Sequence, residues 1–318
     1  MTADQHAVTG LAGDGARHTS RTTVAIITRN RRDSVLHTLD RLAELPERPP
    51  VIVVDNGSDD GTADAVRAHP AGAEVLCPGR NTGALGRTLA VRHARTPYVA
   101  FSDDDSWWAP GALTTAARLL DDHPDLGLVA ARTLVGPDNT EDPLNAVLAN
   151  SPLPPSDRFP GRPVLGFLAC AVVVRRSAYL EAGGYHPLLF FGAEETLLAY
   201  DLTAAGWGVT YTPELTAHHH PDAATARPGR SPLLQRNEAL TGWLRRPLRV
   251  ALRRTATLAG AAARGEPGAT AALLGLLARI PPALAKRHPL PADVEHAIGL
   301  LERPARTPSA VRPGTHQP

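Results

Sequence analysis

Cysteine and aromatic residues are both scarce in this 318-residue chain. The two cysteines, Cys77 and Cys170, have no CxxC spacing and no companion histidines nearby, so neither belongs to a sequence-readable zinc or thiol-redox motif. We expect both to be small buried side chains of a protein in a reducing compartment. Aromatic residues make up only 4% of the chain, so its core must rely on Leu, Val, Ile and Ala.

Long apolar runs and an excess of charge are also absent. No stretch approaches the ~20 apolar residues of a membrane span, and residues 1–21 lack the apolar core of a signal peptide. We therefore expect a cytoplasmic protein with disordered tails at residues 1–21 and 303–318. A formal net charge of +1 gives no reason to expect a nucleic-acid partner.

What the chain does contain is an alternation of strand and helix patterns. Short apolar runs predict strands at residues 24–27, 51–54, 75–76 and 98–101, with helices between them. Asp33 or Ser34 is expected to cap the first helix. This rhythm is typical of an α/β fold with a mostly parallel sheet flanked by helices.

The rest of the chain continues this alternation less regularly. We expect helices at residues 110–120 and 194–205, the second ended by Gly206, and an α-helical C-terminal extension over residues 232–302. The predicted strands are residues 126–131, 164–174 and 209–211, with a long loop at residues 136–163. The expected catalytic domain is residues 22–231, divided into halves at 22–108 and 109–231.

Polar clusters follow four of the predicted strands. Thr28 and Arg29 follow the first, Asp55 the second, Arg80 the third, and Asp103-Asp104-Asp105 the fourth. Taken singly, each cluster is as easily a turn, a helix cap or a solvated surface. Together they would meet in one crevice, because ligands bind at the carboxyl ends of the strands in such sheets.

These segments together resemble the nucleotide-sugar-binding half of family 2 glycosyltransferases, which have the GT-A fold and usually invert the anomeric centre. The matching segments are residues 23–30, 53–62, 80–83 and 101–105. The resemblance extends over residues 22–220 and implies an NDP-sugar donor linked to UDP, dTDP or GDP, with a Mn²⁺ or Mg²⁺ cofactor.

The resemblance also implies roles on the donor side. Thr28 and Arg29 would line the nucleobase pocket, Asp55 would read the base, and Arg80 would contact the base or a phosphate. Asp103-x-Asp105 matches the DXD motif, in which the first acid faces the ribose and the last binds the metal. Asp104 would lie beside the donor without an assigned role.

Residues 190–195 resemble the acceptor-side motif of the same family. Its second acid is the general base, which assigns that role to Glu195, with Glu194 as the alternative because this chain has Glu where Asp is usual. A histidine of the run 218–220, with His219 preferred, would complete the metal shell. Trp107 and Trp108 are expected to pack beneath the acid cluster rather than to form a sugar platform.

The C-terminal region carries leucines at every fourth position from Leu240 to Leu252, with arginines between them. This pattern allows either helices packed on the catalytic domain or a basic surface in contact with a membrane. The QxxRW signature of processive synthases is absent, which favours transfer of a single sugar. The acceptor is then a glycan, a lipid-linked molecule or a small molecule.

Two alternatives to a glycosyltransferase stay open at this point. A nucleotidyltransferase would need a Gly-rich phosphate loop, which the residues after the first strand do not provide. The other is a catalytically inactive sugar-nucleotide-binding or assembly protein.

Overall fold

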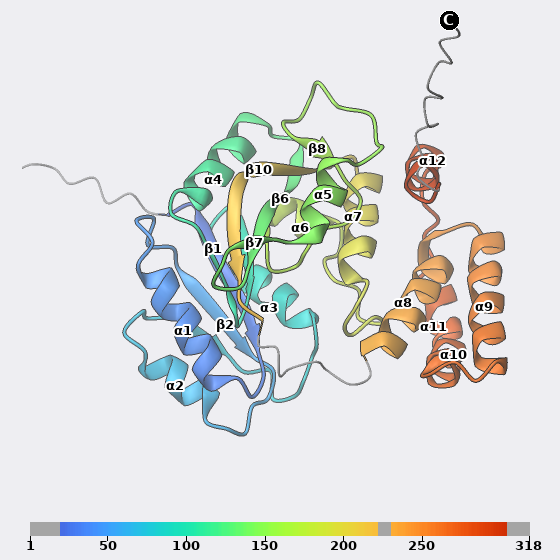
Figure 1. Ribbon diagram of the computed structural model, residues 1–318, viewed down its shortest axis with the longest axis horizontal. Helices are drawn as coiled ribbons and strands as arrows, with labels where there is room; N and C mark the ends of the chain where they lie inside the picture. The colour runs from blue at the N-terminus through green and yellow to red at the C-terminus, as the bar shows by residue number, and fades with distance from the viewer. Residues whose placement is uncertain (1–19, 222–229, 304–318) are drawn as a thin grey trace, which may run out of the picture.

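The computed structural model describes residues 20–221 and 230–303, and their centre is one ten-stranded mixed sheet (Figure 1). Its main path runs β3-β2-β1-β4-β9-β6-β10-β5, with β7 and β8 paired at its side. The strands are β1 (Thr22–Thr28), β2 (Val51–Asp55), β3 (Glu74–Leu76), β4 (Tyr98–Asp103), β5 (Ser106–Trp108), β6 (Leu126–Val135), β7 (Thr140–Glu141), β8 (Arg162–Pro163), β9 (Val172–Arg175) and β10 (Gly208–His219).

Strands β3, β2, β1 and β4 run parallel, and β9 then lies antiparallel between β4 and β6. The α/β fold predicted from the sequence is therefore confirmed, with its parallel part in the first four strands. The carboxyl ends of these strands meet at one edge of the sheet, and the polar clusters follow them.

Helices cover both faces of the sheet (Figure 1). The helices of the sheet region are α1 (Arg32–Ala43), α2 (Thr62–Ala68), α3 (Leu85–His93), α4 (Ala112–Asp122), α5 (Pro143–Ala149), α6 (Arg176–Glu181) and α7 (Glu194–Ala204). Alternate residues of β1 point to opposite faces. Val24 and Ile26 pack in the core shared with α1, α2 and α4, whereas Ala25 packs in the core shared with α3, α6 and α7.

The C-terminal extension is helical, as predicted, and forms a lobe beside α7 (Figure 1). Leu189 and Leu197 of the sheet region join the apolar core of this lobe, while α12 packs on Tyr200. No described helix is long and apolar enough to cross a bilayer. The helices are α8 (Arg230–Arg245), α9 (Leu248–Ala263), α10 (Ala269–Leu277), α11 (Ile280–Ala285) and α12 (Ala292–Leu301).

Several local predictions were wrong. Residues 136–163 are not one long loop, because they contain β7, α5 and β8. Asp142 caps α5 by accepting a 2.8 Å hydrogen bond from the Leu144 amide, and Pro143 follows it as the first helical residue. Residues 164–171 are apolar and mostly buried without being strand, so only β9 remains of the predicted strand 164–174.

The predicted cap of the first helix was also wrong. Helix α1 begins at Arg32 after Arg31, and no side chain caps it. The Ser34 hydroxyl instead donates to the backbone carbonyl of Asp104, 2.8 Å away. This hydroxyl therefore serves the acid cluster rather than its own helix.

The predictions for the scarce residue types had mixed outcomes. Trp107 and Trp108 are buried, which confirms their packing role, and Cys170 is buried as expected. Cys77 is exposed, because it follows β3, a three-residue strand at the edge of the sheet. Of the predicted disordered tails 1–21 and 303–318, residues 1–19 and 304–318 lie outside the described residues.

Candidate active site

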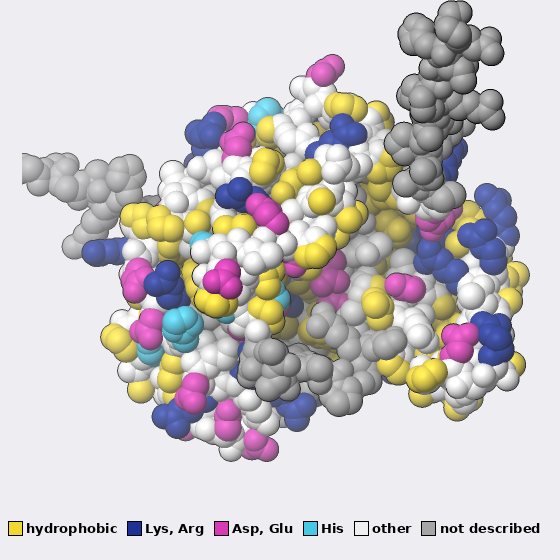
Figure 2. Space-filling view, viewed as in Figure 1, with side chains coloured by type: hydrophobic (Ala, Val, Ile, Leu, Met, Phe, Trp, Pro, Cys, Tyr) yellow, Lys and Arg dark blue, Asp and Glu magenta, His cyan; other side chains and the backbone are white. Residues whose placement is uncertain are grey.

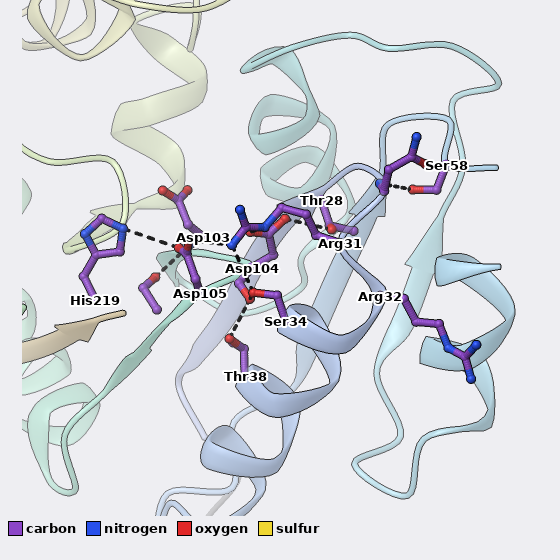
Figure 3. Close-up of polar contacts among 12 residues, drawn as sticks. Thr28, Arg31, Arg32, Ser34, Thr38, Ser58, Asp103, Asp104, Asp105 and His219 are labelled. Atoms are coloured by element: carbon purple, nitrogen blue, oxygen red, sulfur yellow. Dashed lines mark hydrogen bonds and ion pairs between the residues drawn. The ribbon is translucent and has the colours of Figure 1, made fainter. Parts of the chain in front are cut away.

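The site is built around the turn that joins β4 to β5 and carries the three aspartates (Figure 3). Asp104 points into the protein, where one carboxylate oxygen forms a 2.8 Å ion pair with Arg31 and the other accepts a 2.9 Å hydrogen bond from Thr28. Its backbone carbonyl accepts hydrogen bonds from Ser34 and Thr38 of α1. Asp104 is thus the residue that fastens the acid turn to β1 and α1.

Burial raises the pKa of Asp104 to about 7, although the nearby Arg31 guanidinium opposes the shift. Thr28 donates its hydroxyl to Asp104, and Asp104 is buried. Both residues were predicted to contact the donor, and in the structure their side chains bind each other at the floor of the site.

Asp103 faces a buried cation on α3. Arg87 is 1% exposed, and its guanidinium forms a short ion pair with Asp103. The negative charges of Asp103, Glu194 and Glu195 all raise the pKa of Arg87 against the opposing effect of its burial. Arg87 therefore forms an ion pair with the acid turn, and its charge also interacts with the acceptor-side glutamates.

Asp105 lies beside the histidine run because β10 pairs with β5. His219 is the partner of Ser106 in this pairing, and the His220 amide donates to the Asp105 carbonyl at 2.8 Å. His219 Nε2 lies 3.4 Å from Asp105 Oδ1 (Figure 3). Burial lowers the pKa of His219, but the hydrogen bond and charge of Asp105 outweigh this effect and raise it.

Ligand atoms suited to a metal ion converge at this place. One ligand atom each of Asp103, Cys170 and His219 lies within 4.8 Å of the others. Asp105 Oδ1 is buried, and its one neighbouring donor among the described residues is His219 Nε2 at 3.4 Å, a long contact that leaves the charge of this oxygen weakly satisfied. A divalent cation would satisfy that oxygen, and the residues present therefore fit the expected ion.

The ends of β2 and β3 form the other side of the site. Asp55 is buried, and its Oδ1 accepts hydrogen bonds from the Ser58 amide at 2.9 Å and the Ser58 hydroxyl at 2.6 Å, which hold the turn after β2. Asn56 links this turn to residues 82–83 through three hydrogen bonds. Arg29 and Arg80 are exposed. A cavity of about 500 Å³ lies nearer to α1 and is lined by residues 30–34, Asp60 and His220.

The acceptor-side glutamates open α7 after a loop with unusual backbone conformation. Phe190 and Ala193 have φ values of 66° and 63°, a region that costs a residue with a side chain roughly 1–3 kcal/mol. Glu194 is buried and Glu195 is partly exposed. Burial and the negative charge of Glu194 raise the pKa of Glu195 above its ordinary value of 4.5, and Arg87 opposes the shift.

Sequence reasoning missed three residues that the structure brings to the site. Arg31 was not among the predicted site residues, yet it pairs with both Asp104 and Asp105. Arg87 shares one helix face with Ala84, Ala90 and Val91, all buried, and this spacing is a signal that identifies a buried arginine. Cys170 was read as an apolar core residue, and nothing in its sequence neighbourhood points to Asp103 or His219.

The sequence profile described as glycosyl transferase family 2 matches residues 23–183, and the chain belongs to this family. It is a glycosyltransferase. A curated relative, the N-acetylglucosaminyl-diphospho-decaprenol L-rhamnosyltransferase of Mycobacterium tuberculosis, is 28% identical over 260 residues. The match covers 68% of this chain and 83% of the relative.

Solved structures agree with the fold. The mannosyltransferase PcManGT from Pyrobaculum calidifontis, in complex with GDP-Man and Mn²⁺, has a TM-score of 0.53 at 21% identity, covering 88% of this chain and 86% of that one. S. aureus TarS 1–349 in complex with UDP-GlcNAc has a TM-score of 0.55 at 16% identity, covering 87% and 83%. Both likenesses show a shared GT-A fold.

Proposed function

We propose that this enzyme transfers one sugar from a nucleoside diphosphate sugar to an acceptor hydroxyl, with inversion and with Glu195 as the general base. The observation that carries the proposal is the position of Arg87, which pairs with Asp103 and whose charge also acts on Glu194 and Glu195. Asp103 on the donor side and the two glutamates on the acceptor side therefore belong to one charge network. A donor held beside Asp103 would face the glutamates.

The proposed reaction is a single displacement. The Glu195 carboxylate takes the proton of the acceptor hydroxyl while the hydroxyl oxygen bonds to the anomeric carbon. The bond from that carbon to the diphosphate oxygen breaks, and the nucleoside diphosphate leaves with the electron pair. Attack on the face opposite the leaving group inverts the anomeric configuration, and a positioned general base contributes roughly 10²–10⁴-fold to such a step.

The proposed metal ion would be held by Asp103, Asp105 and His219, with Cys170 within reach. When bound, the ion would neutralise the negative charge that develops on the diphosphate leaving group. A nitrogen and a sulfur ligand suit Mn²⁺ better than Mg²⁺. The Mn²⁺ named with PcManGT agrees with this choice.

The proposed donor pocket lies along the ends of β1 to β4. Asp55 would accept a hydrogen bond from the nucleobase, and the exposed Arg29 and Arg80 would contact the base or the phosphates. Asp103 would face the ribose as well as the metal. Thr28 and Asp104 would support this pocket from below, because their side chains bind each other.

The acceptor that we propose is lipid-linked. The relative from Mycobacterium tuberculosis is named for such a substrate. In this chain, five leucines of the C-terminal helices are each 47% or more exposed: Leu248, Leu252, Leu274, Leu277 and Leu284.

Basic side chains accompany these leucines. Arg249 and Arg253 are exposed on α9 next to Leu248 and Leu252, and Figure 2 shows dark-blue side chains gathered along the outer edge of this lobe. Leucines beside arginines fit an anionic bilayer surface, where apolar burial and charge attraction act together. We therefore propose a peripheral position at the inner face of the membrane.

The experiment that tests the function is a turnover assay with a panel of UDP-, dTDP- and GDP-sugars that includes dTDP-L-rhamnose. N-acetylglucosaminyl-diphospho-decaprenol in vesicles serves as acceptor, with Mn²⁺ present. We expect one donor to yield a single-sugar product of inverted configuration. Absence of product with every donor, together with donor binding in a thermal-shift assay, would favour an inactive sugar-nucleotide-binding protein instead.

A further inference from the structure

The loop that leads into α7 is held by two residues of the C-terminal lobe. We call residues 189–193 the acceptor loop. Asn237 of α8 is 0% exposed, and its side-chain nitrogen lies 2.9 Å from the Leu189 carbonyl oxygen, 2.9 Å from that of Phe191 and 2.6 Å from that of Gly192. The two hydrogens of this amide nitrogen therefore lie within reach of three of the five carbonyls of this loop.

Arg236 fixes the direction of that amide. Its Nε donates to Asn237 Oδ1 at 2.9 Å, so the Asn237 nitrogen must face the loop. Its second guanidinium nitrogen donates to the Leu189 carbonyl at 2.8 Å. Arg236 is itself buried and packs against Gly275 of α10, where a Cβ would lie 3.0 Å from its Cδ.

The acceptor loop requires such support because its backbone is strained. Phe190 and Ala193 are left-handed although both carry side chains, and Gly192 between them has a φ of 92°. Conformations of this kind persist only where the surrounding structure determines them. The loop is followed directly by Glu194, the first residue of α7, so the conformation of the loop sets the position and direction of the first turn of that helix.

The donor half holds the other side of the same loop. The Ala84 amide donates to the Phe190 carbonyl at 2.8 Å. A Cβ on Gly83 would lie 2.2 Å from that carbonyl oxygen, so only glycine allows this approach. The acceptor loop is therefore clamped between the start of α3 and α8.

We infer that Arg236 and Asn237 are positioning residues that set the direction of the Glu195 carboxylate, an inference that rests on the proposed role of Glu195 as the base. Neither residue contacts the ends of β1 to β4, where the donor would bind. Their loss should therefore lower turnover without weakening donor binding. The C-terminal lobe would then be part of the catalytic apparatus rather than only a docking unit.

The test is the isosteric change Asn237→Asp, which removes the donor hydrogens and leaves the volume unchanged. Asn145→Asp is the matched control, because Asn145 is a buried amide that donates to the Thr133 carbonyl at 2.8 Å, away from the acceptor loop. Hydrogen exchange of residues 189–195 is measured first, since it needs no substrate. We expect exchange there to rise at least about ten-fold in Asn237→Asp and to stay unchanged in the control.

Kinetics with dTDP-L-rhamnose and N-acetylglucosaminyl-diphospho-decaprenol form the second part. We expect Asn237→Asp to lower kcat at least about ten-fold while the donor KM stays unchanged. In a Glu195→Gln background the same change should not lower kcat any further, because both changes remove the same contribution. The inference would be overturned if hydrogen exchange in the loop stayed unchanged, or if Asn237→Asp lowered kcat by the same factor in the wild type and in Glu195→Gln. Normal turnover of Glu195→Gln would instead overturn the proposed base.

Discussion

His219 Nε2 lies 3.4 Å from Asp105 Oδ1, although the two residues belong to different halves of the predicted catalytic domain. The pairing of β10 with β5 produces this contact, because it places His219 opposite Ser106. Strand β10 thereby carries the histidine from the acceptor half into the acid turn of the donor half. The metal site that we propose depends on both halves being in place.

The first prediction concerns the general base. Glu195→Gln should lower kcat by roughly 10²–10⁴-fold, because the amide cannot accept the acceptor proton. Donor affinity, measured by isothermal titration with the donor from the panel assay, should stay within a factor of about two. Glu194→Gln is the matched control and should retain much more activity. The reverse ranking of the two variants would assign the base to Glu194.

The second prediction concerns pH. The folded pKa of Glu195 is raised above 4.5 by burial and by Glu194, so the unfolded chain ionises this group at a lower pH than the folded protein does. The free energy of unfolding should therefore fall as pH rises from 4.5 through the folded pKa. Over the same range kcat should rise, because the base acts in its ionised form.

Urea unfolding of the wild type and of Glu195→Gln across this pH range measures the effect. The variant should show a weaker dependence of stability on pH and should be the more stable of the two at the alkaline end. An unchanged slope in Glu195→Gln would mean that Glu195 ionises at an ordinary pH in the folded state.

The third prediction concerns the metal ion. If Cys170 reaches the ion, Co²⁺ bound in place of Mn²⁺ should give a near-ultraviolet thiolate-to-cobalt charge-transfer band. Cys170→Ser should abolish this band, and Asp105→Asn should weaken Co²⁺ binding at least about ten-fold. Cys77→Ser is the control, since Cys77 is exposed after β3 and does not belong to the cluster of possible ligands, so its loss should leave the spectrum unchanged. A band that survives Cys170→Ser would exclude the thiol from the coordination sphere.

The fourth prediction concerns the membrane. The double change Leu248→Ser and Leu252→Ser should weaken binding to phosphatidylglycerol vesicles at least about ten-fold in a sedimentation assay. Burying a leucine contributes roughly 1.5–3 kcal/mol, and about 1.4 kcal/mol is a factor of ten. Val147→Ser, at a residue that is 63% exposed but lies on α5, is the control. Equal binding by all three proteins would leave these leucines without a membrane role.

The sequence predicts those strands and helix ends that depend on a local pattern of residues. The buried runs that became β1, β2 and β4 are continuous and apolar, and Gly206 ends the helix signal that became α7. The polar clusters after these strands could be placed in one crevice from the topology of a parallel sheet alone. The roles of Asp105, His219 and Glu195 were assigned by the resemblance to family 2 glycosyltransferases.

The missed features depend on contacts between distant segments. Nothing near Cys170 indicates that its sulfur lies close to Asp103 and His219. Ser34 has the composition of a helix cap, but its hydroxyl binds Asp104 because tertiary packing brings that carbonyl within 2.8 Å. Asn237 could not be recognised either, since its partners are backbone carbonyls of a loop that has no sequence signature.

Arg87 has a consequence for any attempt to recombine this enzyme with its relatives. It lies in the donor half by sequence, yet its charge is balanced in part by glutamates of the acceptor half. A chimera that exchanges residues 109–231 alone would bring new acids to an arginine inherited from the other parent. To transfer acceptor specificity without loss of turnover, Gly83 and helix α3 with Arg87 must be exchanged together with the acceptor half.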